Sequence, residues 1–178
     1  MAKFTIINTF KSIYFDVDKK PLVICDIDMT IIKPEFDIQH YRSMLELEFY
    51  DREELEDMAK SMFHTALGVG FIKATDEEGF IWLNEQVDKR AGKLILLTAR
   101  GASSHEKTLK DLMKAGIKNP EKYEIHYTGG QISKGEYIRK NGLINGFEHI
   151  SFIDDYPQYL SSAFDIYPHI NCYLFKCH

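Results

Sequence analysis

The sequence predicts an α/β protein, with a Rossmann-like parallel β-sheet flanked by helices. Short apolar segments alternate with longer amphipathic segments along most of the 178-residue chain. The apolar segments are nearly continuous, which is typical of parallel strands buried on both faces, and the amphipathic segments between them supply the covering helices. With 44% hydrophobic and 28% charged residues, the chain has enough apolar material for one full core.

Five strands are expected in the sheet, because five apolar segments are bounded by turn or helix signals. No internal repeat or low-complexity segment interrupts them. The predicted strands are Leu22–Ile27, Leu94–Leu97, Glu124–Tyr127, Ile150–Ile153 and Asn171–Phe175.

Four helices are expected between the strands. The first two each begin with a capping-box pattern, in which Ser or Thr precedes Glu by three residues, and each ends at a glycine. The third is expected from Ser133 to near Gly142 and the fourth after Pro157. A further helix is predicted at Asn8–Phe15, before the first strand. The capping pairs are Thr75 with Glu78 and Ser103 with Glu106, and the glycines are Gly92 and Gly116.

One segment departs from this alternation. About 40 residues, from Ile32 to Ala74, follow the first strand, whereas βα loops usually have about 2–6 residues. Apolar residues recur there at helical spacing, and Asp37 and Asp51 are candidate caps for two helices. We therefore expect a core formed by residues 1–33 and 72–178, with a helical hairpin at 34–71 inserted above the carboxyl edge of the sheet.

Composition argues against several functional classes. The net charge of −5 gives no basic surface, so a nucleic-acid partner is not expected. No apolar run approaches the roughly 20 residues that span a bilayer, and the N-terminal residues do not resemble a signal peptide. Three cysteines without metal-ligand spacing favour reduced thiols in a cytoplasmic protein. Oligomeric state is not readable from the sequence.

Polar residues follow each of the first four predicted strands. In an open parallel sheet, ligands bind beyond the carboxyl ends of the strands, so these residues are expected to converge. They are Asp26, Asp28 and Thr30 after the first strand, Thr98 and Arg100 after the second, Lys134 after the third, and Asp154 and Asp155 after the fourth.

Four carboxylates at one edge repel one another, and unaided they would raise the pKa of one or more of the group. A divalent cation removes this repulsion. Oxygen ligands, with no His or Cys among the candidate ligands, favour Mg²⁺, which is commonly held by carboxylates together with a substrate phosphate. Together with the Lys134 ammonium and a threonine hydroxyl, these groups suit the transfer of a phosphoryl group.

The ordered set of motifs resembles that of the haloacid dehalogenase (HAD) superfamily of phosphohydrolases. DIDMT matches the first motif, LILLTAR the second, Lys134 in ISKGEYI the third, and HISFIDD the fourth. The resemblance covers residues 22–175, and the helical hairpin lies where relatives with a C1-type cap have theirs. Dehalogenases of this superfamily lack an acid at the position of Asp28, so a dehalogenase is not implied, whereas phosphoglucomutase-like members share both acids.

The resemblance implies a role for each residue at the strand ends. Asp26 would be the nucleophile that forms an aspartyl-phosphate, and would also ligate the metal. Asp28 would protonate the leaving group and then activate water, while its backbone carbonyl would bind Mg²⁺. Thr98 would hydrogen-bond the phosphoryl group.

The remaining implied roles concern charge and metal. Lys134 would bind the phosphoryl group and balance the charge on it. Asp154 would ligate Mg²⁺ directly, and Asp155 would support the metal directly or through water. Thr30 would shape the turn that directs Asp28 toward the substrate.

The predicted function is a Mg²⁺-dependent phosphatase for small phosphorylated substrates. A phosphotransferase or mutase of the same superfamily, and a phosphate-binding module without turnover, remain alternatives. Each acidic residue could instead serve as a turn or helix cap, and Arg100 could bind substrate phosphate or lie on the surface. The identity of the substrate is not encoded in any recognisable pattern of the predicted cap.

Overall fold

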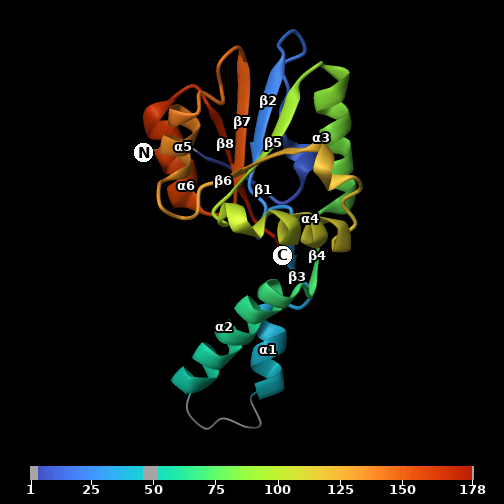
Figure 1. Ribbon diagram of the computed structural model, residues 1–178, viewed down its shortest axis with the longest axis vertical. Coiled ribbons are helices and arrows are strands. Elements are labelled where there is room, and N and C mark those ends of the chain that lie inside the picture. The colour runs from blue at the N-terminus through green and yellow to red at the C-terminus, as the bar shows by residue number, and fades with distance from the viewer. Residues whose placement is uncertain (1–3, 46–51, 178) are drawn as a thin grey trace.

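The computed structural model describes residues 4–45 and 52–177, and it has an α/β architecture built on one parallel sheet (Figure 1). Six strands lie in the order β1-β8-β7-β2-β5-β6, and every neighbouring pair is parallel. Their bounds are Thr5–Ile7 for β1, Pro21–Cys25 for β2, Lys93–Thr98 for β5, Glu124–Tyr127 for β6, His149–Asp154 for β7 and Asn171–Phe175 for β8.

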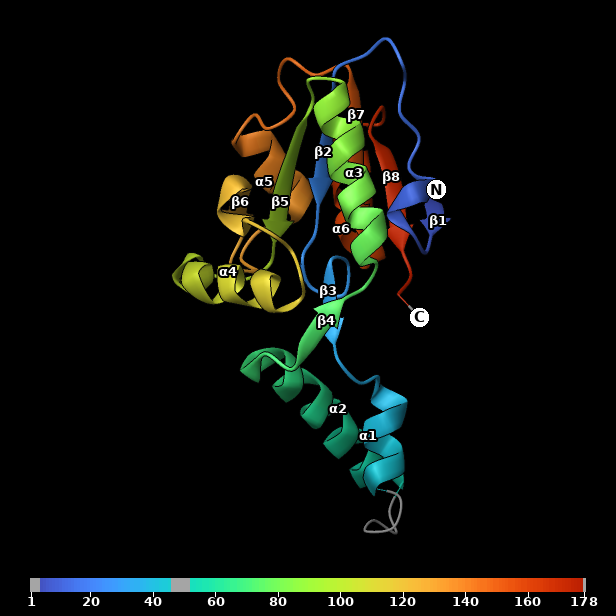
Figure 2. The same ribbon diagram turned by 90° about the vertical axis from the view of Figure 1, so that its right-hand side faces the viewer.

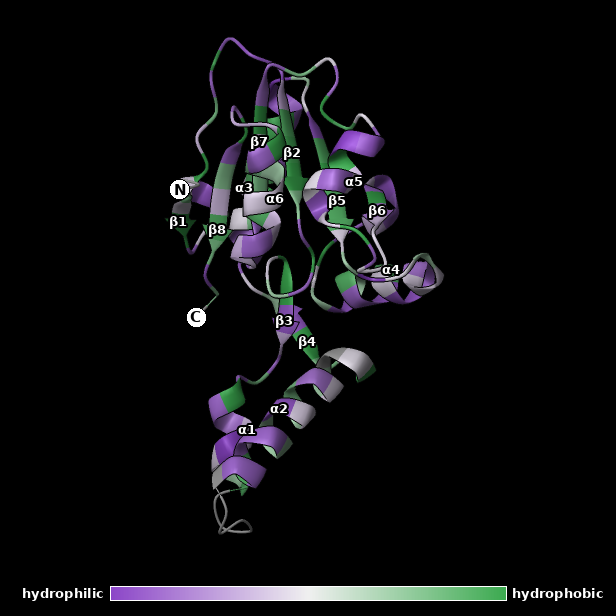
Figure 3. Ribbon diagram, turned by 90° about the vertical axis from the view of Figure 1, so that its left-hand side faces the viewer, coloured by the Kyte–Doolittle hydropathy of each residue, from purple (hydrophilic) through white to green (hydrophobic). Residues whose placement is uncertain are grey.

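The central strand β2 is buried on both faces, as the apolar run predicts. Val23 and Cys25 belong to one core cluster, whereas Leu22 and Ile24 belong to the other. Helix α3 (Glu77–Lys89) covers the first face, and helices α5 (Lys134–Lys140) and α6 (Pro157–Ile166) cover the second (Figure 1). Figure 3 shows the resulting concentration of apolar residues along the central strands.

Two predictions were wrong: that the sheet has five strands, and that Asn8–Phe15 forms a helix. Residues Thr5–Ile7 form the edge strand β1 beside β8, and only a short 3₁₀ helix follows, at Phe10–Ser12. Only Ile7 of this strand is buried, so it leaves almost no hydrophobic pattern. The fully buried Phe10 ring packs on Phe80 and Phe175, and this tertiary contact holds the segment.

Two of the predicted helix caps differ from the structure. Asp76, not Thr75, caps α3, because its Oδ1 accepts a hydrogen bond from Gly79 N at 3.0 Å. Ser103 lies in a 3₁₀ turn, Ala102–Ser104, and α4 (His105–Lys114) begins after it without a side-chain cap. The starts of the last two helices are confirmed: Ser133 Oγ accepts from Glu136 N at 3.2 Å, and Pro157 is the first residue of α6.

Two helices follow the loop after β2 and extend away from the carboxyl end of the sheet (Figures 1 and 2). They are α1 (Ile38–Leu45) and α2 (Arg52–Val69), and they pack around a small apolar cluster of their own. Asp37 caps α1 as expected, since its Oδ1 accepts from His40 N at 2.9 Å, whereas Asp51 lies outside the described residues.

A short antiparallel ribbon, which the sequence pattern did not indicate, joins the two helices to the sheet. It consists of β3 (Ile32–Pro34) and β4 (Ile72–Ala74), with Lys33 paired to Lys73. Over the described part of the chain, no helix combines the length and hydrophobicity needed to cross a membrane. All three cysteines are free thiols.

Candidate active site

The loop after β2 begins where the strand ends at Cys25, and backbone hydrogen bonds fix its path. Asp26 N donates to Ile153 O at 2.9 Å, which ties the loop to β7. The carbonyl of Ile27 accepts from Ile31 N and Ile32 N, at 2.9 and 3.0 Å, and so closes a tight turn. Met29 has a φ of 63°, in the left-handed region. Both acids of the first motif are thereby held at the carboxyl edge of the sheet.

A buried ammonium links two of the predicted carboxylates. Lys134 is fully buried at the start of α5, and its Nζ donates to Asp26 Oδ1 and, at 2.7 Å, to Asp154 Oδ2. Asp154 Oδ1 in turn accepts from Tyr156 N at 2.9 Å. The Tyr159 ring faces the same ammonium, with 4.8 Å between Nζ and the ring centroid. The third and fourth motifs thus meet the first at one buried point.

Three carboxyl groups lie close enough together to hold a cation. Asp26, Asp154 and Asp155 each offer an oxygen, and these oxygens lie within 4.8 Å of one another. Such an all-oxygen donor set is the kind that Mg²⁺ prefers. Asp26 and Asp154 are buried, while Asp155 is partly exposed, so the position is open on one side.

The pKa values of these three acids are raised, so the single ammonium of Lys134 does not fully offset the cost of ionising them. Burial raises the pKa of Asp26 to about 7, with Asp154 and Asp28 adding to the effect against the opposing charge of Lys134. Burial likewise raises the pKa of Asp154 and of Asp155 to about 6 each. Burial alone would lower the pKa of Lys134, but Asp26 and Asp154 outweigh it and raise that pKa. A bound divalent cation would favour the ionised form of all three acids.

Asp28 faces a different counter-ion from Asp26. Arg100 Nε donates to Asp28 Oδ2 at 2.9 Å and Arg100 Nη2 donates to Asp28 Oδ1 at 2.7 Å, which makes a bidentate pair. Thr98 Oγ1 lies 3.5 Å from Asp28 Oδ2 and accepts from Arg100 N at 3.1 Å. The second motif therefore contacts the first through both Thr98 and Arg100.

The sequence left Arg100 undecided between substrate binding and a surface position, and the structure shows that it is not a free surface side chain. Its Nη1 donates to Asp111 Oδ2 at 2.8 Å and to Thr108 Oγ1 at 3.2 Å, both on α4. Asp111 is buried and also accepts from Lys107 Nζ at 2.6 Å. One feature of the sequence indicated that Arg100 belongs to the site: it follows a strand whose carboxyl end lies at the same edge of the sheet as the other candidate residues.

The structure places the predicted residues in two groups at one edge of the sheet. Asp26, Lys134, Asp154 and Asp155 form one group, whose three carboxyls could hold a cation, and Asp28 with Thr98 forms the second group beside Arg100. Thr30 is fully buried within the loop, and its carbonyl oxygen accepts from Thr75 Oγ1. Within the described residues its own hydroxyl has no hydrogen-bond partner, so its contribution to the turn comes from packing and backbone bonds.

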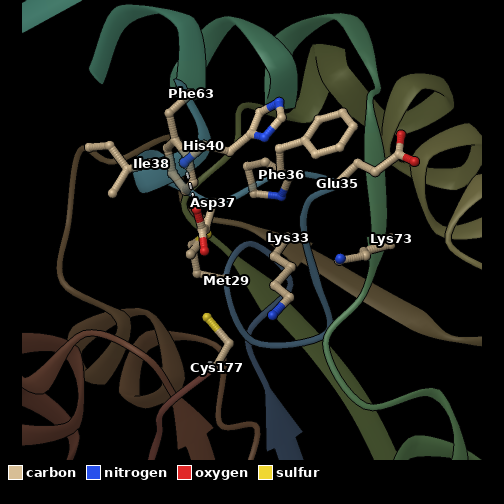
Figure 4. A pocket seen from close by; sticks show the side chains of 11 residues that line it. Met29, Lys33, Glu35, Phe36, Asp37, Ile38, His40, Phe63, Lys73 and Cys177 are labelled. Atoms are coloured by element: carbon tan, nitrogen blue, oxygen red, sulfur yellow. Dashed lines mark hydrogen bonds between the residues drawn. The ribbon is translucent and has the colours of Figure 1, made fainter. Parts of the chain in front are cut away.

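A cavity of about 420 Å³ opens beside the loop after β2 (Figure 4). Met29, directly after Asp28, forms part of its wall, and Cys177 closes it on the side of the sheet. The opposite wall comes from the ribbon, the start of α1, and Phe63 of α2. A volume of this size is within the range of small-molecule sites.

Comparison with known proteins gives one family. A family model described as HAD superfamily, subfamily IIIB (Acid phosphatase) matches residues 2–136. The matched range includes Asp26, Thr98 and Lys134 and ends before Asp154 and Asp155. Among curated proteins, none matches the chain significantly.

Proposed function

Since the chain belongs to subfamily IIIB of the HAD superfamily, the acid phosphatases, we propose that it hydrolyses small phosphomonoesters with Mg²⁺ through an aspartyl-phosphate on Asp26. The observation that carries this proposal is the buried group formed by Asp26, Lys134 and Asp154, with Asp155 beside it. The Asp26 carboxylate offers a nucleophilic oxygen, and the Lys134 ammonium beside it offers a fixed positive charge to the incoming phosphoryl group.

The first half-reaction transfers the phosphoryl group to the protein. An Asp26 oxygen attacks phosphorus and forms a new P–O bond, the ester P–O bond breaks, and the leaving oxygen takes a proton from Asp28. Lys134 neutralises charge on the phosphoryl oxygens, and the Thr98 hydroxyl donates to one of them. The product of this step is the free alcohol.

The second half-reaction returns the protein to its starting state. Asp28 takes a proton from water, the hydroxide oxygen attacks phosphorus, and the bond to the Asp26 oxygen breaks to release inorganic phosphate. Both carboxyl oxygens of Asp28 accept hydrogen bonds from Arg100, which orients this side chain at the edge of the site. The first half-reaction requires Asp28 to be protonated, and therefore requires this pair to open.

Asp26, Asp154 and Asp155 would hold Mg²⁺ through carboxylate oxygens, with the Asp28 carbonyl as a further ligand. When bound, the cation supplies positive charge to the phosphoryl oxygens and to the carboxylates. We also assign residues 34–71 the role of a cap, because both helices lie beyond the carboxyl edge where the proposed site opens (Figure 2).

The proposal is tested by hydrolysis of 4-nitrophenyl phosphate with Mg²⁺ and after its removal by chelation. Asp26→Asn should lower kcat by about 10⁴-fold or more, because catalytic nucleophiles rarely have substitutes. Asp57→Asn is the matched control, since Asp57 is an exposed acid on α2 that pairs only with the exposed Lys60 among the ion pairs recorded for the described residues. Equal rates for wild type and Asp26→Asn would contradict the mechanism, and chelator-resistant turnover would contradict the metal requirement.

A further inference from the structure

The residue proposed to protonate the leaving group, Asp28, lines a cavity of its own. This cavity has a volume of about 300 Å³, and its lining residues are Asp28, Gly68, Arg100, Ser104 and Lys107. The larger cavity of Figure 4 is lined by other residues. Because a general acid lies beside the oxygen that it protonates, a leaving group extends from the site into the cavity of Asp28 and Arg100.

A second cavity, of about 310 Å³, adjoins the first along α4, and Lys107 belongs to both linings. From the helical hairpin, Gly68 lines the first cavity and Val69 the second. Figures 1 and 2 show this end of α2 below α4. We call the two cavities together the α4 groove. At 1.5 Å per residue, Lys110 and Lys114 lie about 5 and 10 Å farther along α4 than Lys107.

The α4 groove has more cations than carboxylates. Its ionisable lining residues are Asp28, Arg100, Lys107, Lys110, Asp111 and Lys114. Both carboxylates are already engaged, since Arg100 donates to each of them and Lys107 donates to Asp111. For residues 4–45 and 52–177, the structure records no ion pair for Lys110 or Lys114. The far end of the groove therefore offers two ammonium groups to an anion.

Two exposed apolar side chains lie beside these ammonium groups. Val69 of α2 and Met113 of α4 line the second cavity and are 57% and 54% exposed. Lys114 also lies close to the junction of hairpin and ribbon, because a Cβ added to Gly70 would be 2.7 Å from Lys114 Nζ. Hydrocarbon next to ammonium groups suits an organic body that ends in an anion.

We propose that the α4 groove receives the leaving group of the substrate, and that Lys110 and Lys114 bind an anionic group at its far end. The substrate class is a phosphomonoester whose alcohol or phenol carries a negative charge beyond a short apolar segment. This inference rests on the proposed phosphatase function, which assigns Asp28 to the leaving oxygen, and it specifies the substrate class of that site.

The test compares 4-(2-carboxyethyl)phenyl phosphate with 4-(2-carbamoylethyl)phenyl phosphate, which have nearly the same shape and differ in one negative charge. Wild type should show a higher kcat/KM for the carboxylate. Lys110→Ala and Lys114→Ala should each reduce that preference by about twofold to fivefold, as expected for one exposed ion pair. The double alanine variant should show almost no preference, whereas Lys110→Arg and Lys114→Arg should keep most of it. Added salt should weaken the wild-type preference, because exposed charges are screened.

Lys118→Ala is the matched control, because Lys118 is an exposed lysine beyond the end of α4 that lines neither cavity of the groove. Its preference should equal that of wild type. Equal kcat/KM for the two compounds in wild type, or a preference that survives the double alanine substitution, would overturn the inference.

Hydrolysis of 4-nitrophenyl phosphate by the same preparation separates this inference from the proposed function. Turnover of 4-nitrophenyl phosphate without turnover of either test compound would overturn the inference alone. Absence of turnover with all three compounds would overturn the proposed function together with the inference.

Discussion

Replacing Arg100 by alanine tests how the second acid of the loop is positioned. The substitution removes two hydrogen bonds to Asp28 and those to Asp111 and Thr108. Among the side-chain hydrogen bonds of the described residues, Asp28 then keeps the long contact to Thr98, at 3.5 Å, and loses its fixed orientation. We expect a fall in both stability and catalysis, with different magnitudes.

The stability loss follows from the burial of the partners. The side chains of Arg100 and Asp111 are 14% and 3% exposed. Removing one partner of a buried ion pair costs about 3–5 kcal/mol, but Lys107 still contacts Asp111 here, so we expect about 2–3 kcal/mol. The free energy of unfolding in urea measures this, and Arg100→Lys should lose less, since it keeps the charge without the bidentate geometry.

The catalytic loss should depend on the leaving group. A general acid contributes about 10²–10⁴-fold, and loss of its positioning should remove about tenfold to hundredfold of that with a poor leaving group. With 4-nitrophenyl phosphate, whose leaving group needs little protonation, the loss in kcat/KM should be much smaller. In a double-mutant cycle with Asp28→Asn, the two effects should be strongly non-additive.

Two results would refute the reasoning on Arg100. Equal losses with good and poor leaving groups would show that Arg100 does not act on proton transfer. Additive effects of Arg100→Ala and Asp28→Asn would show that Arg100 acts on the substrate independently of Asp28.

Three further predictions concern the metal, the lysine and the fold. At 100 times its dissociation constant, Mg²⁺ should stabilise wild type by about 2.7 kcal/mol and raise Tm by several degrees, whereas Asp154→Asn should show little shift in the same thermal melt. Lys134→Met should lose about 3–5 kcal/mol in urea unfolding without Mg²⁺, because two buried carboxyls lose their ammonium; wild-type stability would contradict this. Gly135→Ala should cost about 3 kcal/mol or more, since an added Cβ would lie 2.1 Å from the Ser162 carbonyl oxygen, and an unchanged denaturation midpoint would disprove that close contact.

The central sheet was predictable because its strands are buried on both faces. Residues 22–25 and 150–153 are apolar at nearly every position, so the run itself identifies a parallel strand without any knowledge of its neighbours. The edge strand Thr5–Ile7 and the ribbon Ile32–Pro34 lack this signal. Their residues are stabilised by pairing with distant segments, which a local pattern does not contain.

The candidate site was predictable to the extent that its residues follow strands. Asp26, Thr98 and Asp154 lie at or directly after strand ends. The parallel sheet brings such positions together independently of how the helices pack. The partner of Arg100 could not be found in this way. Asp111 lies on α4, and its contact with Arg100 depends on how that helix packs, a tertiary fact that spacing along the chain does not fix.

The two acids of the first loop are the same residue type two positions apart, yet their surroundings divide them. Asp26 shares a buried ammonium with Asp154 and lies in the group that fits a cation, whereas both oxygens of Asp28 accept from Arg100. An oxygen already engaged by a guanidinium is a poor metal ligand, so the Asp28 side chain is kept out of the cation position. In the proposed mechanism, these different counter-ions leave Asp26 to attack phosphorus and Asp28 to transfer protons.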